Sequence, residues 1–293
     1  MKAVPFEYVR PESLAEACEI LTADEDARII AGGQTLIPML AMRLARPTKL
    51  VDIVRLSELG GIRSDDDALV IGAVTRQVEV ERNEAVRAKL SLLTKALAWV
   101  GHPPTRNRGT IGGSIANADP SAEIPLVAVT LGAEIEIENA GGRMSMPADE
   151  FFIGAMVTSV MPGDCVCAVR FPVWSQPRLG TGFREVSARQ SDFAFVAAAA
   201  QIALDDDGRC LDAVLGLGGV GDRAERVDIS ALVGEDVSRL SISDLVRSAT
   251  EHLEANSDMQ VSADYRRRVA VTLGTRALED AIAEARANDG ALQ

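Results

Sequence analysis

Residues 28–36 read Arg-Ile-Ile-Ala-Gly-Gly-Gln-Thr-Leu, and this stretch decides our interpretation of the fold. A short apolar run ends at Gly32 and Gly33, and a polar pair then leads into apolar residues that begin at Leu36. We therefore predict a strand that turns sharply into a helix. Two residues without a Cβ atom let the backbone approach a ligand closely, and successive N–H groups can form an anion site. The alternative is a plain turn between a strand and a helix.

A second pair of glycines occurs in Thr110-Ile111-Gly112-Gly113-Ser114, again beside a hydroxyl residue. Polar residues follow it closely, namely Asn117, Asp119 and Glu123. Two such loops could hold the two ends of one long ligand with a diphosphate in its middle, because glycine-rich turns present N–H groups to phosphate. Two unrelated glycine turns are the alternative.

The composition excludes some classes of partner. The chain of 293 residues is 47% hydrophobic, enough to bury a substantial core. Its 43 acidic and 30 basic residues give a net charge of −13, which disfavours nucleic acid and anionic membrane. We expect no membrane insertion, because no run approaches the roughly 20 apolar residues of a membrane helix. The start of the chain lacks the apolar core of a signal peptide, which favours a cytoplasmic protein.

The four cysteines, Cys18, Cys165, Cys167 and Cys210, include no pair with Cys-x-x-Cys spacing. They indicate neither a zinc site nor an iron–sulfur cluster, and reduced buried thiols are the default in a cytoplasmic protein. The chain has only two histidines, so we expect no metal site in it.

The hydrophobic patterns divide the chain into three parts. Residues 1–57 read as a β/α unit with a helix capped by Ser13, and residues 58–177 as an α+β region. In that region we expect a short helix capped by Thr75 and one long helix over 85–100. Residues 178–293 read as three antiparallel strands followed by two helices. These five elements are predicted at 181–189, 194–204, 209–216, 240–254 and 263–287.

Residues 216–221 match the Gly-x-Gly-x-x-Gly dinucleotide fingerprint behind a predicted strand. That fingerprint needs a helix directly after it and then a parallel strand. Residues 222–228 lack an apolar helical stripe, and no convincing strand follows them. We therefore favour a tight turn that leaves an antiparallel strand over a NAD site.

Taken together, the two glycine stretches resemble the flavin subunit of the molybdenum hydroxylases, the carbon monoxide dehydrogenase and xanthine dehydrogenase family. Residues 31–35 look like that family's A-G-G-[HQ]-[ST] loop, and residues 110–114 are similar to its T-I-G-G-N loop. Residues 117–125 resemble its N-x-D-P-x-x-D-x-P segment. The similarity runs from Phe6 to the helix that opens at Tyr265, and the order of the motifs makes it specific.

The resemblance implies an α+β protein with the vanillyl-alcohol-oxidase (PCMH) type of flavin fold. Two α/β subdomains, 1–57 and 58–177, would cradle non-covalent FAD, and a C-terminal α+β domain, 178–293, would lie beside them. Because the expected FAD site has neither a Rossmann fingerprint nor a Walker motif, loop amides must carry the diphosphate. The amides of residues 32–35 would do so from one side and those of residues 112–114 from the other. Asp119 and Glu123 would accept hydrogen bonds from sugar hydroxyls, although the family usually has Asp at position 123.

Arg184 and Phe193 complete the expected site. In the family, the matching basic residue can lie near the flavin carbonyls, and the matching ring can lie over the isoalloxazine face. The alternatives are a surface strand residue for Arg184 and core packing for Phe193. The cofactor-binding residues that the resemblance implies are Ala31, Gly32, Gly33, Gln34, Thr35, Leu36, Thr110, Ile111, Gly112, Gly113, Ser114, Asn117, Asp119, Glu123, Arg184 and Phe193.

The resemblance also implies a division of labour among subunits. A large molybdopterin-binding subunit would oxidise the substrate, a small subunit would carry [2Fe-2S] clusters, and FAD on this chain would pass the electrons to an outside acceptor. No catalytic or metal-binding residue is then expected in this chain, which would assemble as a heterotrimer or a dimer of heterotrimers. A self-sufficient flavin oxidase of the same fold and a flavin-free assembly scaffold are the alternatives. The sequence names neither the substrate nor the acceptor.

Overall fold

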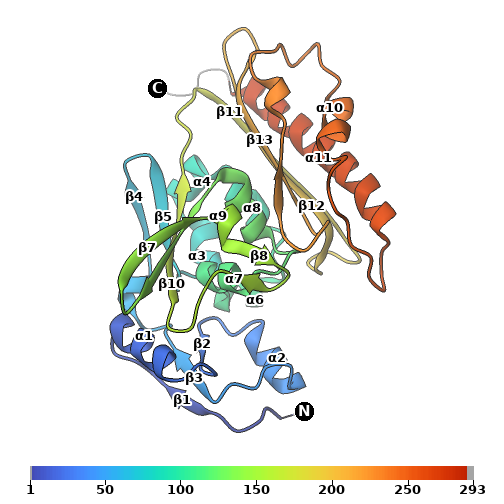
Figure 1. The fold of residues 1–293 in the computed structure, drawn as a ribbon. Coiled ribbons are helices and arrows are strands. Elements are labelled where there is room, and N and C mark those ends of the chain that lie inside the picture. The colour runs from blue at the N-terminus through green and yellow to red at the C-terminus, as the bar shows by residue number, and fades with distance from the viewer. Residues whose placement is uncertain (1, 289–293) are drawn as a thin grey trace.

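The structure, a computed structural model, describes residues 2–288 and consists of three parts, each built around its own sheet. We call them the first part (residues 2–57), the middle part (58–177) and the last part (178–288). Figure 1 shows them following one another along the length of the molecule, with the first part at one end and the last part at the other.

The first part holds a three-stranded parallel sheet in the order β1-β3-β2. Its elements are β1 (Glu7–Val9), α1 (Leu14–Ala23), β2 (Arg28–Ile30), α2 (Leu36–Met42) and β3 (Lys49–Asp52). The predicted cap of α1 is confirmed, because the Ser13 side chain accepts a hydrogen bond from the Glu16 N–H at 3.2 Å. The strand β2 runs directly into the first glycine stretch and α2 follows it, so the predicted strand, turn and helix are also confirmed.

The middle part holds a five-stranded antiparallel sheet in the order β4-β5-β10-β6-β7 and a separate two-stranded sheet, β8-β9. Seven α-helices, α3 to α9, also belong to the middle part. The elements are the 3-10 helix η1 (Ser57–Leu59), β4 (Ile62–Asp65), β5 (Ala68–Gly72), α3 (Gln77–Arg82), α4 (Glu84–Lys89), α5 (Ser91–Leu97), α6 (Pro103–Arg108), α7 (Ile111–Asn117), α8 (Glu123–Leu131), β6 (Glu134–Asn139), β7 (Gly142–Pro147), α9 (Ala148–Phe151), β8 (Phe152–Gly154), β9 (Val157–Thr158) and β10 (Cys165–Pro172).

Two predictions for the middle part are wrong. The expected long helix over 85–100 is two helices, because Leu90 has φ −131° and ψ 51° and interrupts the helical backbone between α4 and α5. Leu90 is itself buried, so tertiary packing holds it at the break. Thr75 does not cap α3, whose N-cap is Arg76; the Thr75 hydroxyl instead donates to the Gly61 carbonyl at 3.0 Å.

The last part holds an antiparallel sheet in the order β11-β12-β13-β14, with two helices on one face. Its elements are β11 (Arg178–Ser187), β12 (Ala194–Leu204), β13 (Cys210–Gly218), β14 (Glu225–Val227), the 3-10 helix η2 (Ser230–Leu232), α10 (Ile242–Ala249) and α11 (Ala263–Ala287). The sheet therefore has four strands where the sequence predicts three, and α10 is shorter than the predicted helix over 240–254.

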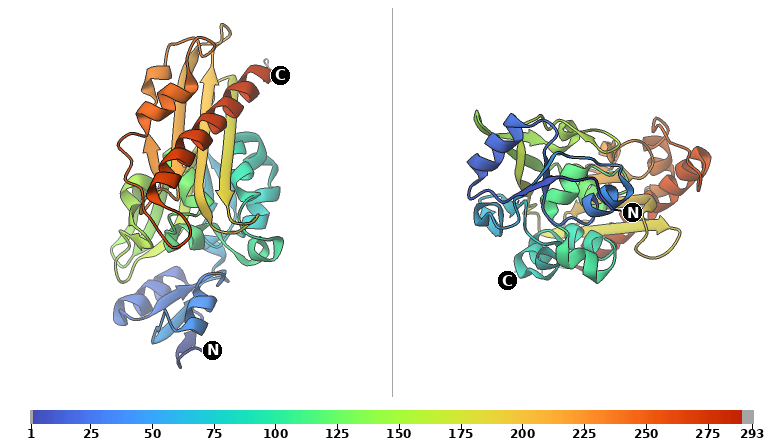
Figure 2. Two further views of the ribbon diagram at one scale, coloured as in Figure 1. Left: turned by 90° about the vertical axis from the view of Figure 1, so that its right-hand side faces the viewer. Right: turned by 90° about the horizontal axis from the view of Figure 1, so that it is seen from below.

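The long helix α11 packs closely on strand β11. Figure 2 (left) shows α11 crossing the face of the sheet diagonally. A Cβ atom on Gly180 would overlap the Ala281 carbonyl, and one on Gly182 would overlap the Ala277 carbonyl. Glycine at these two positions therefore lets the helix backbone lie directly on the strand.

The glycine-rich residues 216–221 end strand β13 and form a turn. The Gly219 N–H donates to the Pro120 carbonyl at 2.8 Å, with Gly219 at φ +71°. The chain then continues as β14, which pairs antiparallel with β13, and no helix intervenes. The preference for a tight turn over a dinucleotide fingerprint is confirmed, and residues 222–228 contain the short strand β14, which the sequence does not predict.

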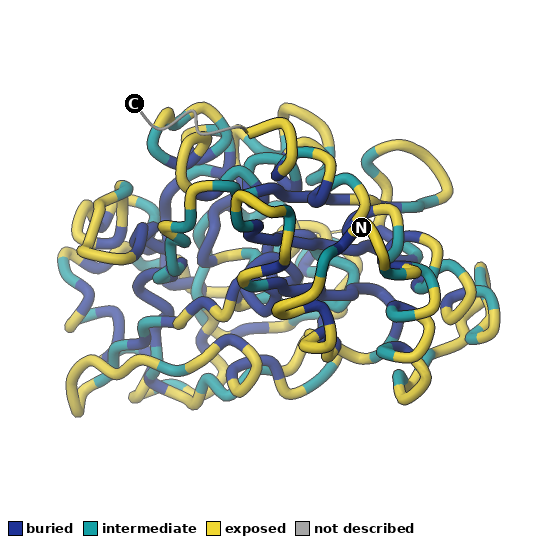
Figure 3. Tube along the Cα trace, turned by 90° about the horizontal axis from the view of Figure 1, so that it is seen from above, coloured by how far each residue is buried: buried dark blue, intermediate teal, exposed yellow. Residues whose placement is uncertain are grey.

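Helix α8 joins the middle part to the last part. All nine of its residues are buried, and one apolar core contains residues of α8, the middle sheet and the last sheet, including Leu126, Phe183 and Val214. Figure 3 shows the corresponding dark, buried tube through the centre of the molecule. Among residues 2–288, no helix is both long and apolar enough to span a bilayer.

Candidate cofactor site

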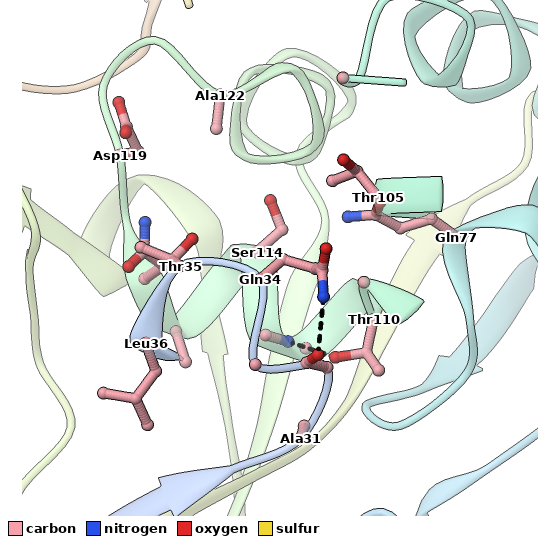
Figure 4. Close-up of a pocket in the computed structure, with 18 of the residues that line it drawn as sticks. Ala31, Gln34, Thr35, Leu36, Gln77, Thr105, Thr110, Ser114, Asp119 and Ala122 are labelled. Atoms are coloured by element: carbon pink, nitrogen blue, oxygen red, sulfur yellow. Dashed lines mark hydrogen bonds between the residues drawn. The ribbon is translucent and has the colours of Figure 1, made fainter. Parts of the chain in front are cut away.

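A cavity of about 690 Å³ is lined by both glycine stretches. Its walls come from the β2–α2 loop of the first part, from helices α3, α6, α7 and α8 of the middle part, and from the β11–β12 loop of the last part. Figure 4 shows Gln34 and Thr35 from the first stretch and Thr110 and Ser114 from the second around the same space. Pockets for cofactors typically have roughly 300–1,000 Å³, so this one is large enough for an extended ligand.

The first glycine stretch presents free backbone donors to the cavity. Gly33 adopts φ +69°, a left-handed conformation that glycine reaches without strain. The Gln34 side chain donates to the Gly32 carbonyl at 3.1 Å and braces the turn. Within residues 2–288, the N–H groups of residues 32–35 donate to no carbonyl and no side chain. This loop therefore has the unpaired donors that an anionic group would require.

The second glycine stretch is different, and the expectation that its amides bind a diphosphate is wrong. The N–H groups of Ile111 and Gly112 donate to the carbonyls of Thr75 and Ala73, at 3.1 and 2.9 Å. Thr110 caps α7 and accepts from the Gly113 N–H on its hydroxyl (3.1 Å) and from the Ser114 N–H on its carbonyl (3.2 Å). All four amides are thus engaged within the chain, so this stretch can offer only side chains to a ligand.

The glycines of the two stretches serve the packing of the chain itself. A Cβ atom on Gly32 would overlap the Arg108 carbonyl, and one on Gly112 would overlap Ala73. The missing side chain of Gly32 therefore lets the first stretch approach the end of α6, and that of Gly112 lets α7 approach the end of β5. Ile111, a predicted site residue, is fully buried and does not line the cavity. The remaining predicted residues of both stretches do line it.

Two carboxylates lie at the end of the cavity nearest to helix α8. The Asp119 side chain accepts from the Ser121 N–H at 2.9 Å. Glu123, in the first turn of α8, is only 9% exposed. Burial raises the pKa of the Glu123 carboxyl to about 7, Asp119 contributes in the same direction, and a hydrogen bond from its own backbone opposes both. Glu123 is thus protonated in part of the molecules at neutral pH.

Phe193 lies at the mouth of the cavity. It is 73% exposed, and it lines the cavity together with Ser191 and Asp192 of the β11–β12 loop. Core packing, the alternative for Phe193, is therefore wrong. An exposed ring at the edge of a cavity can instead cover a flat aromatic ligand.

Arg184 does not lie at the cavity, and its assignment to the site is corrected. On strand β11, its guanidinium forms two hydrogen bonds to Asp280 of helix α11, at 2.5 and 2.8 Å. Arg184 and Asp280 are 48% and 39% exposed, and both side chains lie on the outer, helix-covered face of the last sheet. The alternative, a residue on a surface strand, describes Arg184 correctly.

We therefore expect Arg184→Gln to leave the FAD content and the flavin midpoint potential unchanged. The stability should fall by no more than about 1 kcal/mol, the usual limit for an exposed ion pair. Asp280→Asn should cause a similar loss, and the double variant should lose little more than either single variant, since the two side chains share one interaction. Redox titration and thermal unfolding of the three variants test this. A changed flavin midpoint potential in Arg184→Gln would contradict this expectation and would show that Arg184 acts on the flavin.

Several lining residues had no signal in the sequence. Gln77 of α3 and Thr105 of α6 face the cavity from helices that carry no motif (Figure 4). The buried Oε1 of Gln77 has no hydrogen-bond partner within residues 2–288. Such an unsatisfied acceptor is costly unless a ligand or water meets it, so Gln77 supports a polar ligand in this cavity. Only the packing of α3 against α6 brings these side chains together.

Two protein-family models together match most of the chain. Residues 4–174, which carry the two glycine stretches, match the model of the FAD-binding domain in molybdopterin dehydrogenase. Residues 181–281 match the model of the carbon monoxide dehydrogenase flavoprotein C-terminal domain. The chain belongs to the FAD-binding medium-subunit family of the molybdenum hydroxylases.

Individual members of this medium-subunit family match nearly the whole chain. The 6-hydroxypseudooxynicotine dehydrogenase complex subunit alpha of Paenarthrobacter nicotinovorans is 36% identical, over 98% of this chain and 97% of its own. A chain of quinoline 2-oxidoreductase from Pseudomonas putida 86 has a TM-score of 0.92 with 37% identity, covering 97% and 99% of the two chains. A chain of carbon monoxide dehydrogenase from Hydrogenophaga pseudoflava has a TM-score of 0.93 with 32% identity and the same coverage.

Proposed function

We propose that this protein is the FAD-binding electron-transfer subunit of a molybdenum-containing hydroxylase or dehydrogenase. The observation that carries the proposal is the cavity between the two glycine stretches, both of which lie within the part of the chain that matches the family's FAD-binding domain. When bound, FAD supplies a redox centre that takes electrons singly and releases them singly or in pairs. The work of the chain itself is to hold, orient and partly cover this cofactor.

The residues of the cavity suggest how FAD is held. The four unpaired N–H groups of residues 32–35 would bind the diphosphate, and the side chains of Ser114 and Asn117 would face them from the second stretch. Asp119 and Glu123 would accept hydrogen bonds from sugar hydroxyls, and Phe193 would lie against the ring system. Ala31, Leu36 and Thr110 would complete the walls. Backbone donors suit a diphosphate here, because Arg28 is the one basic residue among the lining residues that the structure describes.

The proposed division of the protein follows its three sheets. Residues 1–57 and 58–177 would form two subdomains that share FAD, and residues 178–293 would form a third domain whose β11–β12 loop covers the cavity. Each of the three larger sheets draws its strands from one of these ranges.

Partner subunits are part of the proposal. One relative is named a subunit of a dehydrogenase complex, and the similar solved chains belong to carbon monoxide dehydrogenase and quinoline 2-oxidoreductase. We propose a large subunit with the molybdenum cofactor and a small subunit with [2Fe-2S] clusters, in a heterotrimer or a dimer of heterotrimers. The four cysteines of this chain are buried and free, which supports assembly in the reducing cytoplasm.

Isolation of the tagged protein from its native host tests this function. We expect two further chains to copurify, one of them with the absorbance of iron–sulfur clusters, and about one FAD per copy of this chain to be released by denaturation. FAD should appear in the supernatant after acid precipitation, because its binding is non-covalent. Substrate oxidation by the isolated chain would point to a self-sufficient oxidase, and a colourless isolated chain to a scaffold; either result contradicts the proposal.

A further inference from the structure

Two buried glutamates come from helix α8 and from the sheet that packs on it, namely Glu123 and Glu185. Glu123 lines the cavity in the first turn of α8, and Glu185 lies on strand β11 of the last sheet. They are 9% and 8% exposed, and the charge of Glu123 raises the pKa of Glu185. Neither carboxylate oxygen of Glu185 has a hydrogen-bond partner within residues 2–288. Glu185 is unaccounted for by the function proposed above.

The sheet register explains why Glu185 is directed toward helix α8. Glu185 pairs with Ala197 of β12, which pairs in turn with Gly218 of β13, so these three residues form one row across the sheet. A Cβ atom on Gly218 would lie 3.3 Å from the Leu126 side chain and 3.5 Å from the Pro120 carbonyl. This row therefore faces the start of α8, where Glu123 is located. Arg184, one position earlier on β11, points to the opposite face.

Among the residues that the structure describes, no cation neutralises the pair. On the elements that surround it, Arg184 is paired with Asp280 and Lys95 of α5 with Glu284. Arg266 of α11 donates to the carbonyls of Phe195 and Gly219 and to Asp258. The further charged groups that line the cavity are Arg28, Asp119 and Asp192. Of all these groups, only the negative Asp119 acts appreciably on Glu123, and only Glu123 on Glu185.

Both carboxyls hold protons more tightly than an exposed glutamate does. Burial raises the pKa of Glu185 to about 8, and the charge of Glu123 adds to that effect. Burial raises the pKa of Glu123 to about 7, and the charge of Asp119 adds to that effect. Because burial disfavours both carboxylate forms and the charge of Glu123 adds to this at Glu185, the two carboxyls together carry fewer than two negative charges near neutral pH.

We propose that Glu123 and Glu185 act together as a proton-accepting carboxyl pair that takes up a proton when FAD adds negative charge to the cavity. The proposal rests on the assignment of this cavity to FAD. The proton comes from solvent and converts one carboxylate of the pair to a carboxylic acid, so the negative charge that the diphosphate brings is partly compensated. Glu185, which does not line the cavity, acts here through its charge interaction with Glu123.

The direction of the pH dependence follows from charge. The bound diphosphate and the displacement of water from the cavity both disfavour the carboxylate forms, so binding raises the proton affinity of the pair. FAD binding is then strongest when the pair is already protonated and weakens as the pH rises through 7 to 9. With one proton taken up, the dissociation constant increases by at most about tenfold per pH unit.

Calorimetric titration of FAD into the FAD-depleted protein tests the proposal. At pH 8, titrations in phosphate and in Tris buffer, whose ionisation enthalpies differ, give the number of protons taken up. We expect a net uptake of up to about one proton per FAD for the wild type. Glu185→Gln should take up much less, and its affinity at pH 8.5 should exceed that of the wild type. Glu19→Gln, which removes an exposed carboxylate of α1, should behave as the wild type does.

The outcomes separate this inference from the proposed function. Binding of FAD without proton uptake, or with equal uptake in Glu185→Gln and the wild type, overturns the inference and leaves the function intact. Failure of the wild type to bind FAD at all would overturn the function instead. The folding of Glu185→Gln is checked by thermal unfolding without FAD. Since a raised pKa in the folded state costs stability as the pH rises through it, this variant should lose less stability than the wild type between pH 6 and 9.

Discussion

Gly33→Val loses most of its FAD while the protein remains folded: this is the result we expect at the first glycine stretch. Gly33 has φ +69°, and a valine Cβ atom would lie 3.1 Å from the Ile37 side chain. The left-handed conformation costs an ordinary residue about 1–2 kcal/mol, and more for a β-branched one. The loop should therefore relax to negative φ and turn its N–H groups away, and a loss of more than about 1.4 kcal/mol in binding lowers the affinity over tenfold.

Gly208→Val is the matched control for this experiment. Gly208 has a similar φ of +79°, in the turn between β12 and β13, and no atom lies within 4 Å of its added Cβ position. It does not line the cavity. Both variants should lose comparable stability through backbone strain, but only Gly33→Val should lose FAD, measured by absorbance after denaturation. Full occupancy in Gly33→Val would remove the first stretch from the cofactor site.

Gly182→Val should produce the largest loss of stability. The added side chain would overlap the Ala277 carbonyl, where helix α11 lies directly on strand β11. Neither backbone can move without disrupting a buried core that includes Ala277, Leu278 and Ala281. Overpacking in cores typically costs about 1–3 kcal/mol. Because the atoms that the new side chain would overlap are backbone atoms of Ala277, which cannot move as a side chain could, we expect a loss of stability of about 3 kcal/mol or more.

Gly154→Val serves as the control, because its added Cβ atom meets nothing within 4 Å and its backbone is not left-handed. Thermal and urea unfolding of the two variants should show a large fall in the midpoint for Gly182→Val and little change for Gly154→Val. Equal unfolding midpoints for Gly182→Val and the wild type would show that α11 does not lie as close to β11 as the structure places it.

The local parts of the fold were predictable because local sequence decides them. The first glycine stretch is a strand followed by a left-handed glycine and a helix, and each step has a signal in adjacent residues. The break at Leu90 has no such signal, since the residues on both sides suit a helix and only packing of the buried leucine imposes the break. Strand β14 was missed for a similar reason, because three residues carry too short a pattern.

The error at Arg184 shows what a strand pattern leaves open. Neighbouring residues on a strand point to opposite faces, but the alternation alone does not say which face meets the cavity. Gly180 and Gly182 are on the same strand face as Arg184, and they indicate that a helix covers this face. The sequence therefore favours Glu185, on the other face, as the residue that faces the middle part.

The hydrogen-bond partners of the amides in the second glycine stretch could not be predicted from its sequence. Paired glycines are compatible both with free amides that bind a phosphate and with amides engaged inside the chain. The acceptors of the Ile111 and Gly112 amides are Thr75 and Ala73, which are distant in sequence. Their positions become known only once the middle sheet is assembled.

The contact of Gly32 with the Arg108 carbonyl has a consequence for the entropy of binding. The two loops that enclose the cavity touch through backbone atoms, and the Arg76 side chain also donates to that carbonyl. Their separation is thus set when the chain folds, before any ligand arrives. A preorganised site avoids the loss of loop freedom on binding, which would otherwise weaken affinity. The conformational cost of building the cavity falls on the folding of the apoprotein, and FAD enters a space whose width is already fixed.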